Sequence, residues 1–379
     1  MPAREKIKEP SLIPLTPSGA ATVRHYRSGE LLSISWDSGL IQSIDAAPPE
    51  AETDLWLAPG LLDLQVNGYA GVDFQQQTSH ITEAGLLQAV RALRRDGCPR
   101  ILLTLITAPW ETLKERIRAY RALITNNAEL RHAIPGWHIE GPFLSDQPGF
   151  SGAHHPGWMM DPSPEMIREL RACVGDDPLL LTLAPERSLS AESIQAAVER
   201  GFIVSAGHSN ASREALQTAA EAGLRAYTHL GNGCPQQLDR HDNILWRVIE
   251  ESRLVAGLIP DSIHLSPALF RILHRVLGPD RIYWTTDAMS AAGAPVGLYS
   301  LGSIELMVGE DRIVRHPVTK TFAGSALEPF EGIRRGAAML GVSWREVWDY
   351  FSVQPARLMN LPCDLTPGAQ TSFCLIRET

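Results

Sequence analysis

Four polar residues that could do chemistry each follow a short apolar run. Glu140 stands in the segment HIEGP, His208 in AGHSN, His229 in YTHL and Asp287 in TTDA. One carboxylate and two imidazoles form the ligand set of a catalytic zinc site, which keeps a further position for water. We therefore predict one divalent metal ion per chain, zinc, held by Glu140, His208 and His229, with Asp287 beside it.

Each of these residues also has an ordinary structural explanation. A single histidine at a strand end is often only hydrogen-bonded, and Glu140 could stabilise the start of a following helix. Three residues of ligand type at three expected strand ends, with an aspartate at a fourth, favour the metal site. The first apolar run contains Gln65-x-Asn67, and because amides are poor zinc ligands we expect no second metal ion there.

Eight apolar runs alternate with amphipathic stretches and must position these residues. The expected strands are residues 61–66, 101–106, 134–139, 179–183, 202–205, 225–228, 254–259 and 281–285. The expected helices are residues 83–95, 112–123, 164–173, 190–199, 212–222 and 267–277. This alternation predicts an α/β fold of the (β/α)8 TIM-barrel type, with a doubly wound sheet as the alternative. In a barrel, the chemistry gathers at the carboxyl ends of the strands.

The two ends of the chain have a β-like pattern. Expected strands at residues 21–26, 31–35 and 40–44 surround turns at Gly29 and residues 37–39, and residues 372–376 follow the turn at Pro367. We predict a small β-sandwich domain from residues 1–56 plus 362–379, and the barrel over residues 57–361. Apolar runs at residues 303–308 and 312–314 predict a β-hairpin insertion near residues 297–316.

The composition narrows the class of protein. The 379 residues are 44% hydrophobic and 20% charged, which is typical of a folded globular protein. The formal net charge of −9 argues against a broad surface for nucleic acid or an anionic membrane. The five cysteines form no Cys-x-x-Cys pair, which favours reduced thiols, and residues 1–7 lack an apolar signal core. We predict a cytoplasmic protein.

Six motifs in chain order resemble the signatures of one enzyme family. They are residues 59–68 (PGLLDLQVNG), 138–143 (HIEGPF), 207–211 (GHSNA), 228–230 (THL), 286–288 (TDA) and 323–327 (AGSAL). Together they resemble the N-acetylglucosamine-6-phosphate deacetylases of the amidohydrolase superfamily, and residues 182–186 (TLAPE) and 367–369 (PGA) also fit. The resemblance implies a metal-dependent barrel that hydrolyses a linear amide. The implied reaction converts N-acetyl-D-glucosamine 6-phosphate to glucosamine 6-phosphate and acetate, in amino-sugar catabolism.

The resemblance also implies roles for single residues. Asp287 would take the proton of the attacking water and give it to the leaving amine, and His154 would donate a hydrogen bond to the developing oxyanion. Arg240 would reach the substrate phosphate across the interface of a homodimer. The other residues matched to substrate contacts are Ala153, Asn232, Gly233, His264, Phe322, Ala323 and Gly324.

Two loops depart from the family pattern. After the second metal histidine the family usually has an aromatic or aliphatic residue, then Asn-Ala-Met and, after the arginine, Glu-Pro-Gly; this chain has GNGC at 231–234 and HDN at 241–243. Ser262 stands where the family usually has glycine. A second hypothesis is therefore a related amidohydrolase that deacylates a different N-acyl amino sugar, unphosphorylated or differently substituted. A third is a catalytically silent binding protein, against which the intact ligand set argues.

Overall fold

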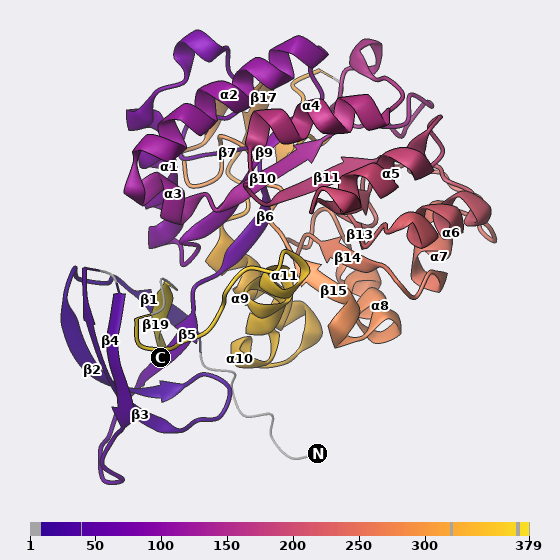
Figure 1. The fold of residues 1–379 in the computed structure, drawn as a ribbon. Coiled ribbons are helices and arrows are strands. Elements are labelled where there is room, and N and C mark those ends of the chain that lie inside the picture. Colours follow the sequence, from indigo (N-terminus) through magenta and orange to yellow (C-terminus); the bar gives the residue numbers. More distant parts are fainter. Residues whose placement is uncertain (1–8, 39, 319–320, 369–371, 379) are drawn as a thin grey trace.

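The computed structural model describes residues 9–38, 40–318, 321–368 and 372–378 (Figure 1). Three sequence predictions concern residues outside this set: the N-terminal segment 1–7, Gly39 of the expected turn and Ala369 of the C-terminal motif. Within the described ranges, no helix combines the length and the apolar character needed to cross a membrane.

Eight parallel strands form the central sheet, as the alternation of apolar and amphipathic segments predicts. They are β6 (Leu62–Val66), β9 (Arg100–Ile106), β10 (Gly136–Glu140), β11 (Leu179–Leu183), β12 (Ile203–Ala206), β13 (Ala226–Tyr227), β14 (Val255–Leu258) and β15 (Ile282–Trp284). They neighbour one another in chain order, so their carboxyl ends meet at one rim (Figure 1). Each coincides with one of the eight expected runs. The fold is therefore a (β/α)8 barrel.

Helices cover the outside of the barrel (Figure 1). They are α1 (Glu83–Arg95), α2 (Trp110–Asn126), α3 (Ala128–Ala133), α4 (Pro164–Val174), α5 (Ser190–Glu199), α6 (Arg213–Ala222), α7 (Ile244–Glu250), α8 (Pro267–Leu277), α9 (Pro329–Leu340), α10 (Trp344–Val347) and α11 (Val353–Leu358), with 3-10 turns at Thr78–His80, Pro156–Trp158, Pro279–Arg281 and Trp348–Phe351. The hydroxyls of Thr82, Ser163 and Ser212 cap α1, α4 and α6, a position that favours such residues. The bounds of α1, α5 and α8 agree with the sequence prediction.

The barrel closes between its first and eighth strands without a regular ladder. β6 and β15 are the two ends of the eight-stranded order. A single bridge joins Val66 to Ala288 and another joins Ala288 to Ser325, and the backbone N–H of Asn67 donates to the carbonyl of Ala288 at 2.7 Å. The rim at this point is therefore closed by residues that flank Asp287.

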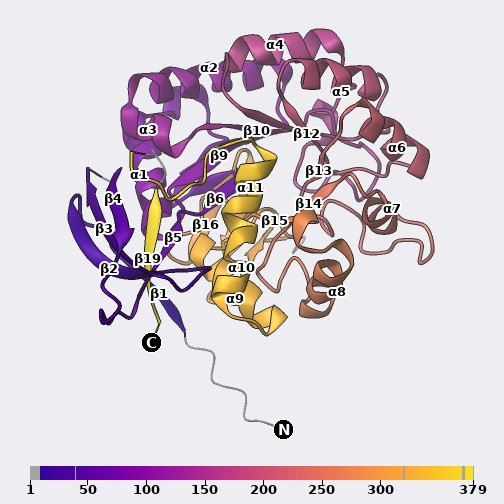
Figure 2. The same ribbon diagram turned by 60° about the horizontal axis from the view of Figure 1, so that its bottom comes forward.

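The two ends of the described chain meet in one six-stranded sheet (Figure 2). Its order is β1 (Pro10–Ile13), β19 (Phe373–Glu378), β5 (Leu55–Pro59), β2 (Gly19–His25), β3 (Leu31–Asp37) and β4 (Leu40–Ala46). One sheet stands in place of the two facing sheets of a sandwich, and it packs an apolar cluster that includes Val23, Ile34 and Trp36. β5 crosses the predicted boundary at residue 56, so the small sheet extends to Pro59; the division into domains stays a prediction.

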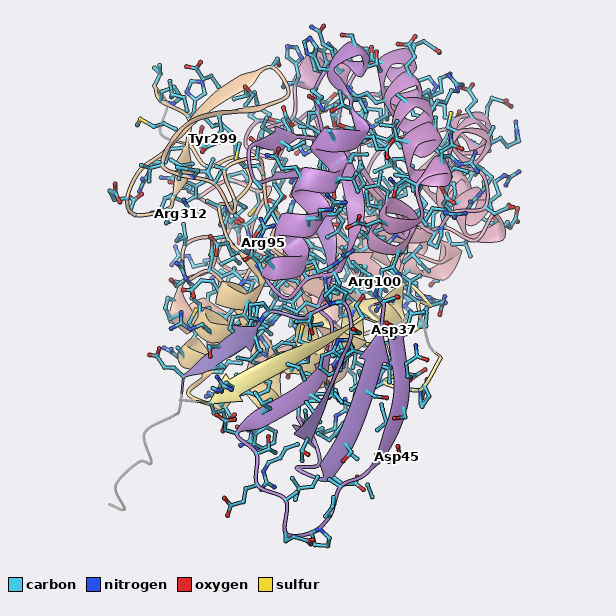
Figure 3. All side chains as sticks on the ribbon, turned by 90° about the vertical axis from the view of Figure 1, so that its left-hand side faces the viewer. Asp37, Asp45, Arg95, Arg100, Tyr299 and Arg312 are labelled. Carbon is cyan, nitrogen blue, oxygen red and sulfur yellow. The ribbon has the colours of Figure 1, made fainter. Side chains whose placement is uncertain are left out.

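An antiparallel insertion follows the eighth strand, in the segment where a hairpin was predicted. It has three strands, β16 (Gly297–Leu301), β17 (Ile304–Val308) and β18 (Val314–Arg315), and it buries Leu306 and Val308 against Met289. Figure 3 shows this insertion, marked by Tyr299 and Arg312, at the other end of the molecule from the small sheet. A short ribbon of β7 (Gly68–Tyr69) and β8 (Val72–Asp73) follows β6.

Candidate active site

The candidate residues stand where strands end and the chain turns. Glu140 is the last residue of β10, and His208, His229 and Asp287 follow β12, β13 and β15. The last three have backbone φ angles of 48°, 35° and 53°, in the left-handed region that residues other than glycine rarely adopt. Such strain costs about 1–3 kcal/mol per residue and gathers at functional sites. Three of the four candidate residues, His208, His229 and Asp287, therefore stand in strained turns at the rim of the barrel.

Glu140 lies at the centre of the group and is buried. Its Oε1 lies 2.9 Å from Nε2 of His229 and 3.4 Å from Nε2 of His208, and its Oε2 accepts a hydrogen bond from Nε2 of Gln65 at 3.1 Å. Burial alone would raise the pKa of Glu140, but hydrogen bonds from the two imidazoles hold that pKa well below its usual range. The structure thus brings together the three residues predicted as metal ligands.

The imidazole of His208 is wedged between two glycines. Its Nδ1 lies 2.8 Å from the carbonyl oxygen of Phe150, which directs Nε2 toward Glu140. A Cβ atom at Gly152 would lie 2.7 Å from Cε1 of His208, and one at Gly233 would lie 2.8 Å from Nδ1. Both glycines also have positive φ angles, 55° and 62°. Only glycine leaves room for the ring at these two positions.

His154 lies in the same group, although the sequence predicted it as a substrate contact and not as a ligand. Its Nε2 is 3.8 Å from Oε2 of Glu140, and its Nδ1 is 2.9 Å from the hydroxyl of Thr107. Burial, and then the charge of His208, lower the pKa of His154 to about 3, so the ring is neutral at pH 7. Sequence reasoning missed Thr107, whose only signal is its place directly after the expected strand 101–106. The neighbouring Ala153 packs against the cluster under the insertion.

The donor set fits a divalent metal ion. Ligand atoms of Glu140, His154 and His208 all lie within 4.8 Å of one another, and His229 contacts the same carboxylate. Among the described residues, Nδ1 of His229 is buried without a hydrogen-bond partner, while Nε2 of the same ring faces Glu140. Carboxylate and imidazole together suit zinc and other first-row metals. The cluster thus offers three histidines, of which the sequence predicted two as ligands.

Asp287 is buried beside this cluster and receives a hydrogen bond from an amide. Nδ2 of Asn67 donates to Oδ1 of Asp287 at 2.7 Å, just as Gln65 donates to Glu140. Burial, and then the negative charge of Glu140, raise the pKa of Asp287 to about 6. A carboxyl with such a pKa can both accept and release a proton near neutral pH.

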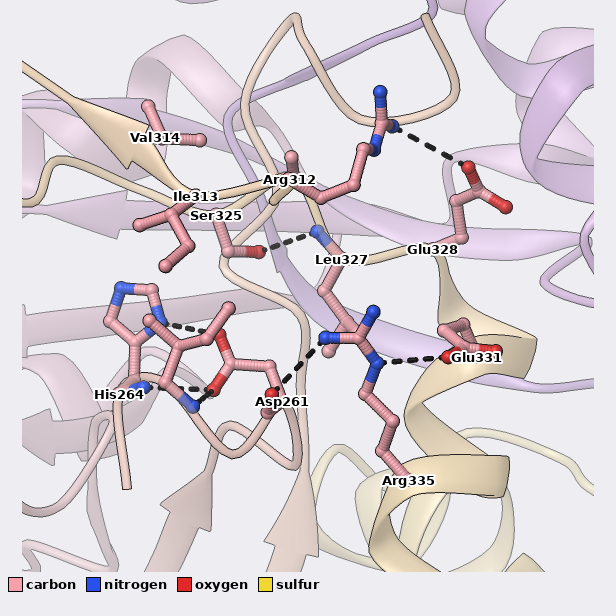
Figure 4. A pocket seen from close by; sticks show the side chains of 12 residues that line it. Asp261, His264, Arg312, Ile313, Val314, Ser325, Leu327, Glu328, Glu331 and Arg335 are labelled. Carbon is pink, nitrogen blue, oxygen red and sulfur yellow. Dashed lines mark hydrogen bonds and ion pairs between the residues drawn. The ribbon is translucent and has the colours of Figure 1, made fainter. Parts of the chain in front are cut away.

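His264 approaches from the loop after β14 and is held by Asp261. Its Nδ1 lies 2.6 Å from Oδ2 of Asp261, and its charge is one of those that act on Asp287. Figure 4 shows the cavity of about 220 Å³ that this loop lines, where Arg335 donates to the backbone carbonyl of Asp261. The ring of Phe322, which is 46% exposed, has its centre 5.6 Å from that of His264. His264 and Phe322, both predicted as substrate contacts, therefore lie together.

The other predicted contacts are spread over two loops. Nδ2 of Asn232 donates to the carbonyl of His229 at 3.3 Å, within the loop that carries Gly233. Ala323 and Gly324 precede Ser325, whose N–H donates to the carbonyl of Asp287 at 2.8 Å. Arg240 is exposed, and its guanidinium has no hydrogen-bond or ion-pair partner in the part of the chain that the structure describes. Within one chain, it does not join the buried group.

Two departures from the family pattern have a local structural meaning. Gly231 has a φ of 96°, and a Cβ atom there would lie 2.5 Å from Cδ2 of Leu265. A larger side chain is therefore excluded unless the loop moves. Ser262 has a φ of 63°, a conformation natural for glycine that costs other residues roughly 1–2 kcal/mol.

Comparison with known proteins places the chain among enzymes. No family model matches it. It is 31% identical over 334 residues to the N-acetylglucosamine-6-phosphate deacetylase of Rattus norvegicus and 32% identical over 335 residues to that of Homo sapiens, with 85% of this chain and 80% of each relative covered. A mutant of the Mycobacterium smegmatis N-acetyl-D-glucosamine-6-phosphate deacetylase, solved in complex with N-acetyl-D-glucosamine-6-phosphate, superposes with a TM-score of 0.82, 27% identity and 93% coverage of both chains. The Pasteurella multocida deacetylase superposes with a TM-score of 0.79 and 26% identity, and the match covers 92% of this chain and 91% of that chain. The chain therefore belongs to the N-acetylglucosamine-6-phosphate deacetylase family.

Proposed function

We propose that this protein is a metal-dependent deacetylase that hydrolyses N-acetyl-D-glucosamine 6-phosphate to glucosamine 6-phosphate and acetate, in amino-sugar catabolism. The family supports the reaction and the substrate class. The observation that carries the proposal is that a buried carboxyl with a raised pKa, Asp287, lies within electrostatic reach of the cluster of Glu140 and His229. This arrangement combines a metal site with a group able to move a proton.

Glu140, His208 and His229 would hold a single divalent metal ion, for which we propose zinc. When bound, such an ion supplies Lewis-acid polarisation of the acetyl carbonyl and of the attacking water. A second ion is not part of the proposal. The amides of Gln65 and Asn67 are poor zinc ligands, and both already donate to carboxylates.

Asp287 would move the proton in both halves of the reaction. As a carboxylate it takes a proton from the attacking water while the new C–O bond forms. As a carboxylic acid it then gives that proton to the amide nitrogen while the C–N bond breaks, so that the amine and acetate leave. The hydrogen bond from Asn67 occupies Oδ1 and leaves Oδ2 for the proton.

His154 would donate a hydrogen bond to the oxyanion that develops on the acetyl carbonyl. This role requires the ring proton on Nε2, with Nδ1 accepting from Thr107, whose backbone N–H and hydroxyl lie 3.4 and 2.9 Å away. The opposite tautomer would leave Nε2 free to bind the metal ion together with Glu140 and His208. The lowered pKa of His154 keeps the ring neutral, so it can stabilise an oxyanion only as a hydrogen-bond donor.

The sugar and its phosphate would be held by loop residues. We propose the sugar contacts Ala153, Asn232, Gly233, His264, Phe322, Ala323 and Gly324. Arg240 would bind the phosphate in the site of the neighbouring subunit of a homodimer, since its planar fork suits phosphate. Nε1 of Trp246, a residue 44% exposed, donates to the carbonyl of Arg240 at 3.2 Å, and exposed aromatic residues beside arginine are typical of interfaces.

The cytoplasm is the compartment we propose, because all five cysteines are free, as expected where thiols stay reduced.

The altered loop supports a second candidate function. Residues 231–243 carry GNGC and HDN in place of the usual family residues, and Gly231 and Gly233 shape this loop through positive φ angles. A related N-acyl amino sugar, unphosphorylated or differently substituted, would then be the substrate.

One experiment separates the two candidates. Acetate release is measured from a panel of N-acetyl hexosamines with and without a 6-phosphate, after the purified protein has been loaded with zinc. The proposal expects kcat/KM to be highest for N-acetyl-D-glucosamine 6-phosphate. A higher value for an unphosphorylated sugar would replace it with the second candidate, and no release from any member would refute both.

A further inference from the structure

Asp63 is a fully buried carboxylate of β6 that the proposed reaction does not use. It accepts hydrogen bonds from four groups, one on β6 and three on the residues that directly follow β15. Oδ1 lies 2.5 Å from the hydroxyl of Thr285 and 3.1 Å from the backbone N–H of Gln65. Oδ2 lies 2.5 Å from the hydroxyl of Thr286, and the N–H of Thr286 points between the two oxygens at 3.2 and 3.1 Å.

These contacts replace the missing strand pairing at the closure of the barrel. β6 and β15 form no ladder, and the described backbone joins them only near Val66 and Asn67. Asp63 lies toward the start of β6, so its side chain ties this part of the strand to Thr285 and Thr286, which directly follow β15. The carboxylate therefore joins the first strand to the segment that leads directly into Asp287.

The hydrogen bonds continue from Thr286 to both sides of Asp287. The hydroxyl of Thr286 accepts a hydrogen bond from the N–H of Ala288 at 3.0 Å, and its carbonyl accepts one from the hydroxyl of Ser325 at 2.6 Å. Asp287 stands between these two fixed residues, with its φ of 53°. A strained turn of this kind persists only where its surroundings hold it in place.

We infer that Asp63 is a positioning residue for the reaction: through Thr286 it fixes the turn that aims the carboxylate of Asp287 at the substrate. The inference rests on the proposed function, because it assumes that Asp287 moves the proton. Asp63 itself touches no reacting atom in this scheme.

The chemistry of position 63 suits this role. The two hydroxyls and two N–H groups that face it all donate, and only an ionised carboxylate accepts on every side. Burial raises the pKa of Asp63 to about 6, against the lowering effect of its hydrogen bonds, so the group is ionised at neutral pH. An asparagine would keep the shape but would turn N–H groups toward Thr286, whose own N–H faces the same atoms.

Thr285 and Thr286 provide a matched pair of variants. Each hydroxyl lies 2.5 Å from the same carboxylate, and both threonines are fully buried. Of the two hydroxyls, only that of Thr286 accepts a hydrogen bond from Ala288, the residue after Asp287. We expect Thr286→Val to lower kcat by roughly 10- to 100-fold with KM nearly unchanged, since small misplacements of a reacting group have effects of this order. Thr285→Val should lower kcat by less than about 3-fold. Thr286→Ser keeps the hydroxyl and should restore kcat.

The measurements are kcat and KM for acetate release, zinc content and melting temperature of each variant. Similar losses of melting temperature with unequal losses of kcat would support positioning. Equal losses of kcat in the two valine variants would overturn the positioning role and show that Asp63 only stabilises the fold. Asp63→Asn, if folded and zinc-loaded with a normal kcat, would overturn it as well. Inactivity of the wild-type protein would instead refute the proposed function.

Discussion

Gly233 lies against the imidazole of His208, so closely that a Cβ atom at position 233 would stand 2.8 Å from Nδ1 of the ring. A Cβ atom at Gly152 would lie 2.7 Å from Cε1 of the same ring. Alanine is the residue that the family usually carries at position 233, so this chain has changed a residue in direct contact with a proposed metal ligand. The present position of the His208 ring therefore depends on glycine at position 233.

Gly233→Ala should weaken zinc binding by about tenfold or more, because the methyl group must push aside the ring of His208. Zinc affinity is measured by competition with a chelator. The control is Gly201→Ala, where φ is 74° and no atom lies within 4 Å of the added Cβ, so that backbone strain is introduced without a contact. Equal zinc affinity in the two variants would show that the contact with His208 is unimportant.

Replacement of single histidines should identify which of them bind the metal ion. His208→Ala and His229→Ala should lose the single equivalent of zinc, whereas His154→Ala should keep it and lose turnover, because His154 donates to the oxyanion. Elemental analysis gives the zinc content of each purified variant. Loss of zinc from His154→Ala with retention in His229→Ala would transfer the ligand role to His154, whose ligand atom lies within 4.8 Å of those of Glu140 and His208.

Asp287→Asn should keep the fold and the zinc but lower kcat by at least about 100-fold, because an amide cannot accept the proton of the attacking water. In the wild-type protein, kcat should fall as the pH drops through about 6, since Asp287 accepts a proton only when ionised and its pKa is raised to about that value. Both results come from a pH series of acetate release. A variant with near-normal kcat would remove Asp287 from the mechanism.

Arg240→Ala should reduce kcat/KM for the 6-phosphorylated substrate by roughly 2–3 kcal/mol, the scale of hydrogen bonds to charged groups. An unphosphorylated N-acetyl sugar should be almost unaffected. Arg240→Lys keeps the charge but loses the paired hydrogen bonds, and should recover only part of the loss. Equal effects on both sugars would favour the second candidate function.

Ser262→Gly should stabilise the protein by about 1 kcal/mol, because glycine relieves the strain of a φ of 63°. Ser262→Ala is the control, since it removes the hydroxyl but keeps the strain. Chemical denaturation measures the free energy of unfolding of both variants. If the alanine variant gains as much as the glycine variant, the hydroxyl and not the backbone is the source of the effect.

The sequence predicts the barrel well because each of its strands is a short apolar run between amphipathic segments. Expected strand 179–183 coincides with β11, and expected helix 190–199 with α5. β13 has only the residues Ala226 and Tyr227, shorter than expected, because the chain must already turn toward His229. The strand β1 escaped prediction, because a four-residue segment with two apolar residues acquires its β conformation from pairing with β19.

The side chains that fix the candidate site are harder to predict than the site itself. Types and local motifs pointed to Glu140, His208, His229 and Asp287. The role of Asp63 depends on its contact with Thr286, which lies 223 residues away in the chain. A local sequence pattern cannot predict a contact over such a separation. The same holds for the closeness of Gly233 to His208, which depends on how the loop after β13 folds back over the rim.

The place of β19 in the small sheet has a consequence for how the molecule is made. β19 pairs with β1 on one side and β5 on the other, so these two early strands lack their common neighbour until residues 373–378 have left the ribosome. The complete barrel sequence is synthesised while both edges stay open. Pairings between such distant segments form slowly, and open strand edges bind other chains. Until β19 is made, a nascent chain therefore exposes the edges of β1 and β5 at which other chains can pair.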